Sequence, residues 1–250
     1  PYDTACMDAF FRALPFRLTG AQSGAIDQIL RDLSSGHVMN RLVQGDVGSG
    51  KTLVAAALMW QCAENGYMSA FMAPTEILAE QHYSTLSSML APLGVRIGRL
   101  TGAMSAKEKR ETKAKLKAGE YDIVVGTHAL FSQDVEYSNL ALVVTDEQHR
   151  FGVDQRAALS AKGDDPHLLV MSATPIPRTL ALIAYGDLDV SVIDELPPGR
   201  QKVDTFALGE SYRPRVQAFI RKLAAAGQQI FIVCLSLIHI SEPTRRTPIS

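Results

Sequence analysis

The sequence has little cysteine and no long hydrophobic run, and each shortage excludes a class of protein. Only 3 of the 250 residues are cysteines, and Cys6, Cys62 and Cys234 stand too far apart for a zinc site or a disulfide framework. No apolar stretch approaches the ~18 residues that a membrane-spanning helix needs. We therefore expect the protein to reside in a reducing, cytoplasmic compartment and to have no membrane partner.

Charge of one sign does not dominate either. Lys and Arg number 25 and Asp and Glu number 26, which gives a formal net charge of -1. A binding site for nucleic acid would therefore have to be a local feature rather than a property of the whole surface. With 46% hydrophobic and 20% charged residues, the composition is that of a globular protein and excludes a disordered chain, a collagen-like repeat and a coiled coil.

Short strands and longer helices are expected to alternate through most of the chain. The segments LALVVTD and HLLVMSA are apolar on both faces, which is typical of parallel strands covered by helices on each side. This pattern predicts an α/β fold with a doubly wound parallel sheet. The expected strands are residues 41–44, 69–73, 96–100, 123–126, 140–146 and 168–172. The expected helices between and around them are residues 3–14, 20–34, 51–65, 76–90, 105–118 and 176–184.

Proline-rich breaks in this pattern suggest where the main lobe begins and ends. Pro15 ends the first expected helix, so residues 1–15 are assigned to the end of a preceding segment. The run DELPPGR, which starts at Asp194, indicates a linker because it contains two prolines and a glycine. The main lobe is therefore expected to comprise residues 16–193.

The rest of the chain is expected to contain only the start of another unit. Residues 194–234 hold the linker, one expected helix (213–226) and one expected strand (229–233) of a second α/β unit. Residues 235–250 are polar and Pro-rich after their first six residues, and they resemble the translation of a sequencing adapter. We expect this tail to be non-native and, because the chain begins with Pro1 rather than Met, we expect a piece of a longer protein.

A glycine-rich loop stands between an expected strand and an expected helix. It matches the pattern G-x-x-x-x-G-K-[ST] in full, and glycines there allow successive backbone N–H groups to surround a phosphate. Lys51 supplies a positive charge for the β- and γ-phosphates, and the hydroxyl of Thr52 is a ligand for Mg²⁺. The loop therefore predicts a site for ATP and Mg²⁺. Its residues are Gly45, Asp46, Val47, Gly48, Ser49, Gly50, Lys51 and Thr52.

Two carboxylates end the apolar strand 140–146. In an ATPase with this type of loop, the first would hold Mg²⁺ and the second would polarise the attacking water, and Asp146 and Glu147 fit these roles. An acidic pair after a strand can equally cap the next helix. The glycine-rich loop favours the catalytic interpretation.

The sequence resembles the superfamily 2 DExH-box helicases at several motifs. Residues 146–149, DEQH, resemble the DExH box, and residues 16–22 resemble the adenine-binding Q motif. Residues 73–81 resemble motif Ia, and residues 172–175, SATP, resemble motif III. The longer strings DEQHRFGVDQR and SATPIPRTLA are similar to the RecG family of branched-DNA helicases. Transcription-repair coupling translocases are similar in RFGV and SATPIPRTL, but they typically carry Glu where this chain has Gln148.

The resemblance, which covers residues 10–234, implies a RecA-like fold, the first motor lobe of a helicase, and a role for each matching residue. Gln22 would bind the adenine edge through its amide, with Phe16 near the base. Gln148 and His149 would couple the ATP site to DNA, and Ser172 and Thr174 would couple hydrolysis to movement of a second lobe. The residues implied to hold the DNA backbone, without recognising sequence, are Thr75, Thr101, Gly102, Thr127 and His128.

The resemblance also implies the activity. We expect a monomeric, ATP-hydrolysing DNA helicase of the bacterial cytosol or nucleoid, which acts on branched DNA such as replication forks and recombination intermediates. The chain alone is expected to turn over little ATP, because the arginine finger of this family lies in the second lobe. The alternatives are a translocase of the transcription-repair coupling type and a nucleotide-binding switch that does not unwind DNA.

Two local features of the sequence each allow two interpretations. His128 could contact DNA or could be a hydrogen-bonded loop residue. The expected helix 105–118 presents Lys109, Lys113 and Lys117 on one face. That face could be a solvated helix surface or a stripe that faces DNA.

Overall fold

The computed structural model of the chain describes residues 4–14, 17–146, 165–174, 188–195 and 204–233. The chain divides into two compact units, Pro1–Arg200 and Gln201–Ser250. The first unit contains the sheet and the candidate site. Predictions for Phe16, Glu147, Gln148, His149, the helix 176–184 and the tail 235–250 lie outside the described residues.

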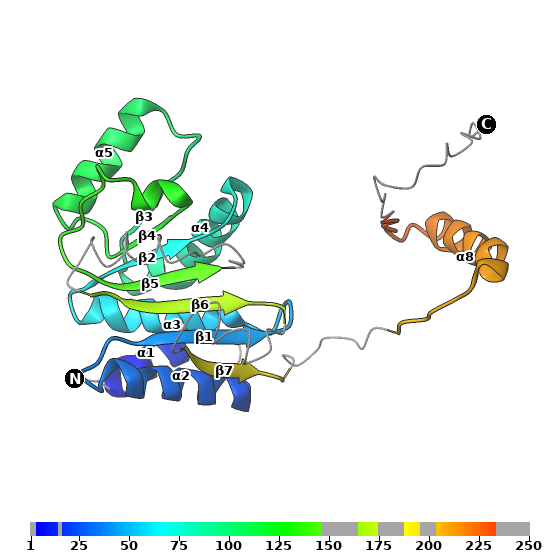
Figure 1. Cartoon of the computed structure of the whole chain (residues 1–250), viewed down its shortest axis with the longest axis horizontal. Helices are drawn as coiled ribbons and strands as arrows, with labels where there is room; N and C mark the ends of the chain where they lie inside the picture. Colours follow the sequence, from blue (N-terminus) through cyan, green and yellow to red (C-terminus); the bar gives the residue numbers. More distant parts are fainter. Residues whose placement is uncertain (1–3, 15–16, 147–164, 175–187, 196–203, 234–250) are drawn as a thin grey trace. The chain divides into compact units, whose positions relative to one another are not determined.

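The first unit is built on a parallel sheet of 7 strands with the order β3-β4-β2-β5-β6-β1-β7 (Figure 1). Every pairing between neighbouring strands is parallel, as the apolar strands predicted. The strands are β1 (Asn40–Gly45), β2 (Met68–Met72), β3 (Ile97–Leu100), β4 (Ile123–Gly126), β5 (Leu140–Asp146), β6 (His167–Ser172) and β7 (Asp189–Ile193). The predicted doubly wound α/β fold is confirmed, and six of the strands were expected from the sequence.

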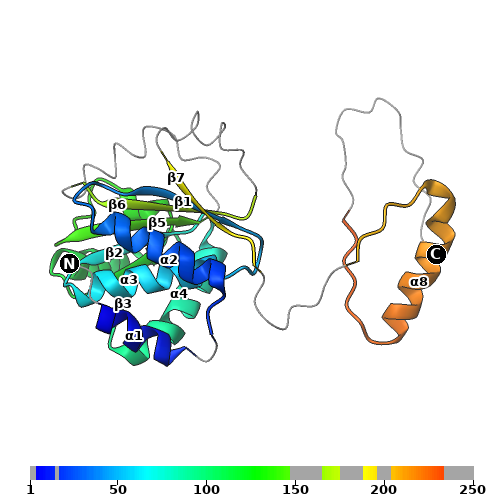
Figure 2. The same cartoon turned by 90° about the horizontal axis from the view of Figure 1, so that it is seen from below.

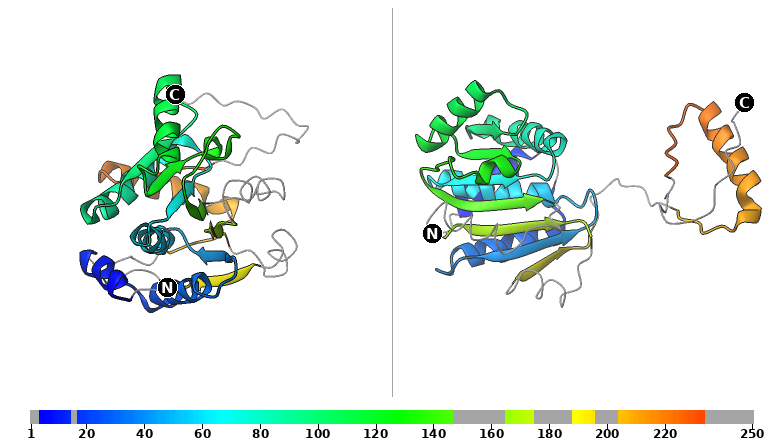
Figure 3. Two further views of the ribbon diagram at one scale, coloured as in Figure 1. Left: turned by 90° about the vertical axis from the view of Figure 1, so that its left-hand side faces the viewer. Right: turned by 45° about the horizontal axis from the view of Figure 1, so that its top comes forward.

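Helices cover both faces of this sheet. One face packs against α1 (Thr4–Ala13), α2 (Gly20–Leu33), α3 (Lys51–Glu64) and α4 (Glu76–Leu90), which lie together on one side in Figure 2. The other face packs against Leu116 of α5 (Ala106–Lys117) and Leu130 of the 3-10 helix η2 (His128–Phe131). Figure 3 shows α5, in green, near the β3 end of the sheet and α2, in blue, near the β7 end.

Helix α3 lies at the centre of the larger core. Met59 and Trp60 are 0% and 5% exposed, so both serve in packing. Helix α2 begins with a cap at Thr19, whose hydroxyl accepts a hydrogen bond from the backbone N–H of Gln22. Helix α2 then contributes Ile26, Ile29 and Leu30 to the same core.

The strand β7 was not predicted from the sequence. Of its two buried residues Ser191 is polar and Ile193 is apolar, whereas the apolar Val192 between them is 53% exposed, so the strand shows no regular apolar alternation. Ser191 faces Arg41 of β1, whose guanidinium donates a hydrogen bond of 2.9 Å to the serine hydroxyl. A strand held by a buried polar contact gives no apolar alternation to recognise.

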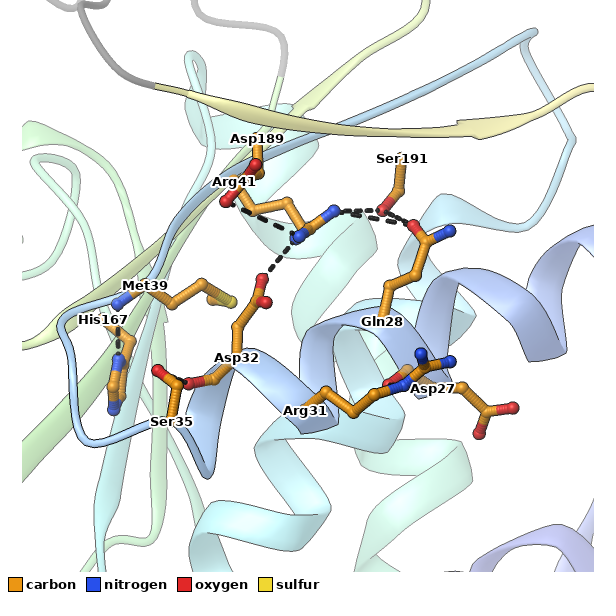
Figure 4. Close-up of polar contacts among 10 residues, drawn as sticks. All are labelled: Asp27, Gln28, Arg31, Asp32, Ser35, Met39, Arg41, His167, Asp189 and Ser191. Carbon is orange, nitrogen blue, oxygen red and sulfur yellow. Dashed lines mark hydrogen bonds and ion pairs between the residues drawn. The ribbon is translucent and has the colours of Figure 1, made fainter.

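Arg41 is the centre of a polar network that joins α2, β1 and β7 (Figure 4). Its Nε lies 2.6 Å from Oδ2 of Asp32, and its side chain is 9% exposed. Gln28 completes the network by accepting a hydrogen bond of 2.6 Å from Ser191. Beside it, Nδ1 of His167 accepts from the backbone N–H of Met39, and burial lowers the pKa of this histidine.

The second unit contains η3 (Glu210–Tyr212) and α8 (Arg213–Ala225), so the expected helix 213–226 is confirmed. The expected strand 229–233 is wrong, because these residues form no strand. Phe231 and Val233 are 86% and 87% exposed, and the described residues of this unit include no other strand for pairing. A parallel strand needs a neighbour for its backbone hydrogen bonds, so the apolar pattern alone cannot form it.

Within the described part of the chain, no helix is both long and apolar enough to cross a membrane.

We predict that replacing Arg41 by Met lowers the free energy of unfolding by about 2 kcal/mol, because Asp32 and Ser191 lose a buried partner. Arg31→Met is the matched control, since Arg31 is exposed and should cost less than ~0.5 kcal/mol. Urea unfolding followed by the fluorescence of Trp60, the single tryptophan, measures both. Equal unfolding midpoints for the two variants would contradict the role of the network.

Candidate functional site

The candidate site lies where the central strands of the sheet end. In the parallel register Gln44 of β1 pairs with Ser172 of β6, and Met171 of β6 pairs with Asp146 of β5. The glycine-rich loop, the first acidic residue and motif III therefore come together at the carboxyl edge of three adjacent strands. Ligand sites of open α/β sheets form at this edge.

The loop between β1 and α3 has the backbone that its glycines predicted. Gly48 and Gly50 have φ angles of 78° and 92°, in the left-handed region that favours glycine. A Cβ at Gly45 would lie 2.6 Å from Oγ of Ser49, and a Cβ at Gly50 would lie 2.3 Å from Nε2 of Gln22. Side chains at Gly45 and Gly50 would thus displace the loop from its neighbours.

The ammonium of Lys51 lies against this loop. Its Nζ donates hydrogen bonds of 2.6 Å to the carbonyl of Gly45 and 3.0 Å to the carbonyl of Asp46. The carboxylate of Asp46 in turn accepts from the N–H of Val47 at 2.8 Å. These contacts hold the positive charge of Lys51 at the first turn of α3.

Gln22 joins the Q-motif helix to the glycine-rich loop. Its Nε2 donates a hydrogen bond of 2.7 Å to the carbonyl of Ser49, and its Oε1 accepts from the backbone N–H of Thr19 at 3.0 Å. Gln22 is 3% exposed. The side chain is therefore engaged with the protein at both ends of its amide. Because an amide has two protons and two lone pairs to offer, these contacts still permit the predicted contact with adenine.

Asp146 has a partner that the sequence analysis missed. Its Oδ2 lies 2.7 Å from Nε2 of His82 on α4, and both side chains are 12% exposed. The ring of His82 also packs on Phe71, with 4.5 Å between ring centroids. No spacing links a histidine to an aspartate 64 residues later, so only the fold brings them together.

Motif III forms a compact turn beside this pair. The hydroxyl of Ser172 accepts a hydrogen bond from the N–H of Thr174 at 3.2 Å and lies 3.1 Å from the Thr174 hydroxyl. Ser172 is 3% exposed. The two predicted coupling residues are thus bound to each other at the end of β6.

The predicted DNA-contacting residues lie at the other half of the same edge, where β2, β3 and β4 are adjacent. Thr75 caps α4 through a hydrogen bond of 3.3 Å from the N–H of Leu78. Thr101 and Thr127, which follow β3 and β4, are largely buried, whereas Gly102 and His128 are exposed. The structure therefore places these residues together but leaves the hydroxyls of Thr101 and Thr127 with little access to a ligand.

The lysines of α5 are engaged mostly with acidic residues of the protein itself. Lys113 forms an ion pair with Asp134, and Lys117 pairs with Glu136 at 2.7 Å. Lys109 instead donates a hydrogen bond of 2.5 Å to the carbonyl of Gly102. These pairs favour a solvated helix surface over a stripe that faces DNA.

Comparison with known proteins identifies the family. The family model of the DEAD/DEAH box helicases matches residues 19–183, which include the glycine-rich loop, Asp146 and motif III. The chain belongs to this family.

The most informative relatives are RecG proteins. The chain is 50% identical over 225 residues to the ATP-dependent DNA helicase RecG of Bacillus subtilis, covering 90% of the chain and 33% of that protein. It is 48% identical over 243 residues to RecG of Escherichia coli O127:H6, covering 95% of the chain and 35% of that protein. The chain therefore spans about a third of the length of the curated relatives it matches.

Solved structures support the same family. RecG bound to a three-way DNA junction superposes with a TM-score of 0.80 at 43% identity, covering 91% of this chain and 30% of that one. A hypothetical ATP-dependent RNA helicase from Sulfolobus tokodaii superposes with a TM-score of 0.56 at 22% identity, covering 77% of this chain and 57% of that one. The second match shows the fold alone.

Proposed function

We propose that the chain is the first motor lobe of an ATP-dependent DNA helicase that acts on branched DNA. The observation that carries this proposal is the convergence of the glycine-rich loop and Asp146 at one sheet edge, with the predicted DNA-contacting residues at the other half of that edge. The RecG relatives at about 50% identity support a DNA helicase, and the structure of RecG bound to a three-way DNA junction supports branched DNA as the substrate.

The described residues fit ATP and Mg²⁺. The N-cap of α3 is Gly50, which has no side chain to cap the first turn, so the N–H groups there suit phosphate oxygens. The Oγ of Ser49 is buried and has no hydrogen-bond partner among the described residues. We infer that Lys51 would bind the β- and γ-phosphates and that Gln22 and Phe16 would hold the adenine.

Thr52 and Asp146 would hold Mg²⁺, which would offset the negative charge of the phosphates. Glu147 would accept a proton from the attacking water, and Gln148 and His149 would connect this chemistry to DNA. Ser172 and Thr174, already bound to each other, would transmit closure of the cleft between two lobes.

DNA would lie along the ends of β2, β3 and β4. The exposed Thr75, Gly102 and His128 would hold its backbone without recognising sequence, and Thr101 and Thr127 would join them only if DNA binding exposed their buried hydroxyls. We also infer a location in the bacterial cytoplasm, since the RecG relatives come from bacteria such as B. subtilis and E. coli, and the monomer stays a prediction.

We predict that Lys51→Ala weakens binding of Mg²⁺·ATP at least ~100-fold, because a charge-assisted contact worth about 3 kcal/mol is lost. The fold should be kept, since the lysine ammonium binds loop carbonyls rather than filling the core. Calorimetry measures the affinity, with Lys107→Ala on the exposed face of α5 as the control. Unchanged affinity of the Lys51 variant would rule out the proposed phosphate site.

We predict that the 250-residue chain binds ATP but hydrolyses it slowly, unwinds no DNA and is stimulated little by forked DNA. An arginine finger raises turnover roughly 10³–10⁵-fold in related enzymes, and in this family it comes from a second lobe. ATP hydrolysis should be measured with and without forked DNA for this chain and for a full-length RecG relative. Strong DNA-stimulated turnover by the chain alone would show that the second lobe is dispensable.

A further inference from the structure

We propose that His82 is a positioning residue of the magnesium site, which fixes the carboxylate of Asp146 for metal binding. This inference rests on the nucleotide site proposed above. The evidence is the 2.7 Å contact between Nε2 of His82 and Oδ2 of Asp146.

The direction of this hydrogen bond follows from the chemistry of the two groups. An ionised carboxylate can only accept a hydrogen bond. We therefore assign the N–H of His82 to Nε2, which donates the hydrogen bond to Oδ2. One oxygen of Asp146 is thereby committed to the histidine. The other oxygen, Oδ1, would then be the one available to a metal ion or to a water molecule bound to it.

The surroundings hold the histidine in this orientation. Its ring packs on Phe71 of β2 with an interplanar angle of 43°, and β2 is paired directly with β5, which carries Asp146. Both side chains of the pair are 12% exposed, so little water competes for the contact. A carboxylate on a flexible single bond would otherwise sample several rotamers and lose entropy on binding metal.

Partners that orient metal ligands have measurable effects. Removal of such a partner typically lowers metal affinity by 10- to 100-fold, because the ligand must then be ordered by the metal itself. A residue that only fills space would instead affect the fold, and with it nucleotide binding in the absence of metal. The two possibilities can therefore be separated by comparing affinities with and without metal.

The experiment measures binding of a fluorescent ATP analogue to the 250-residue chain in excess Mg²⁺ and in excess chelator. The ratio of the two affinities gives the metal enhancement. His82→Leu keeps an apolar side chain against Phe71 but removes the donor, and His82→Gln keeps an N–H donor of similar reach. His37→Leu, at an exposed histidine after α2, is the matched control.

We expect His82→Leu to lower the metal enhancement about tenfold, while the affinity in chelator stays unchanged. His82→Gln should restore most of the enhancement, and His37→Leu should behave as wild type. In an Asp146→Ala background, His82→Leu should cause no further loss, because its effect passes through the carboxylate. If His82→Leu unfolds, His82→Asn, whose amide is too short to reach Oδ2, should show the same selective loss.

Three results would overturn the inference. The first is full metal enhancement in His82→Leu, and the second is an equal loss of affinity with metal and in chelator. The third is a loss in His82→Leu that persists in the Asp146→Ala background. If wild type itself fails to bind the nucleotide, the proposed nucleotide site fails as well, which is a different outcome from a wild type that binds normally beside an unaffected His82 variant.

Discussion

The register of β1, β5 and β6 is the constraint on which the candidate site depends. Parallel pairing places Gly45, Asp146 and Ser172 at one edge, although more than a hundred residues separate the first from the last. A slip of one residue in β5 would turn Asp146 toward the other face of the sheet and away from the loop. The hydrophobic residues of both sheet faces prevent such a slip, because each of these three strands contributes buried apolar side chains to both core clusters.

Helix α2 contacts the glycine-rich loop on one side and the residues that follow β7 on the other. Gln22 binds the carbonyl of Ser49, and the close approach of this amide is why Gly50 has no room for a side chain. On the same helix end, Glu195 accepts a hydrogen bond of 3.3 Å from the N–H of Ala21. The start of the linker thus contacts the Q-motif helix, and this helix contacts the glycine-rich loop.

Much of this arrangement could be predicted from the sequence, because the features that carry it are local. The apolar strands, the cap at Thr19 and the glycine-rich loop all depend on residues that are close in the chain. The contacts that were missed are between distant residues: His82 with Asp146, Arg41 with Ser191, and Glu195 with Ala21. The strand β7 was missed for the same reason, since one of its two buried side chains is a serine that is paired with Arg41. The strand expected at 229–233 is wrong for the opposite reason: its local pattern is suitable, but the described residues of that unit include no strand with which it could pair.

The most direct test of this account is a crystal structure of the chain with Mg²⁺ and a non-hydrolysable ATP analogue. We predict that the triphosphate lies in the loop 45–52, within hydrogen-bond distance of Nζ of Lys51, and that Mg²⁺ contacts the hydroxyl of Thr52. Asp146 should face the metal through Oδ1 while Oδ2 keeps its contact with His82. A triphosphate bound away from the loop, or a metal ion that involves neither Thr52 nor Asp146, would contradict the account.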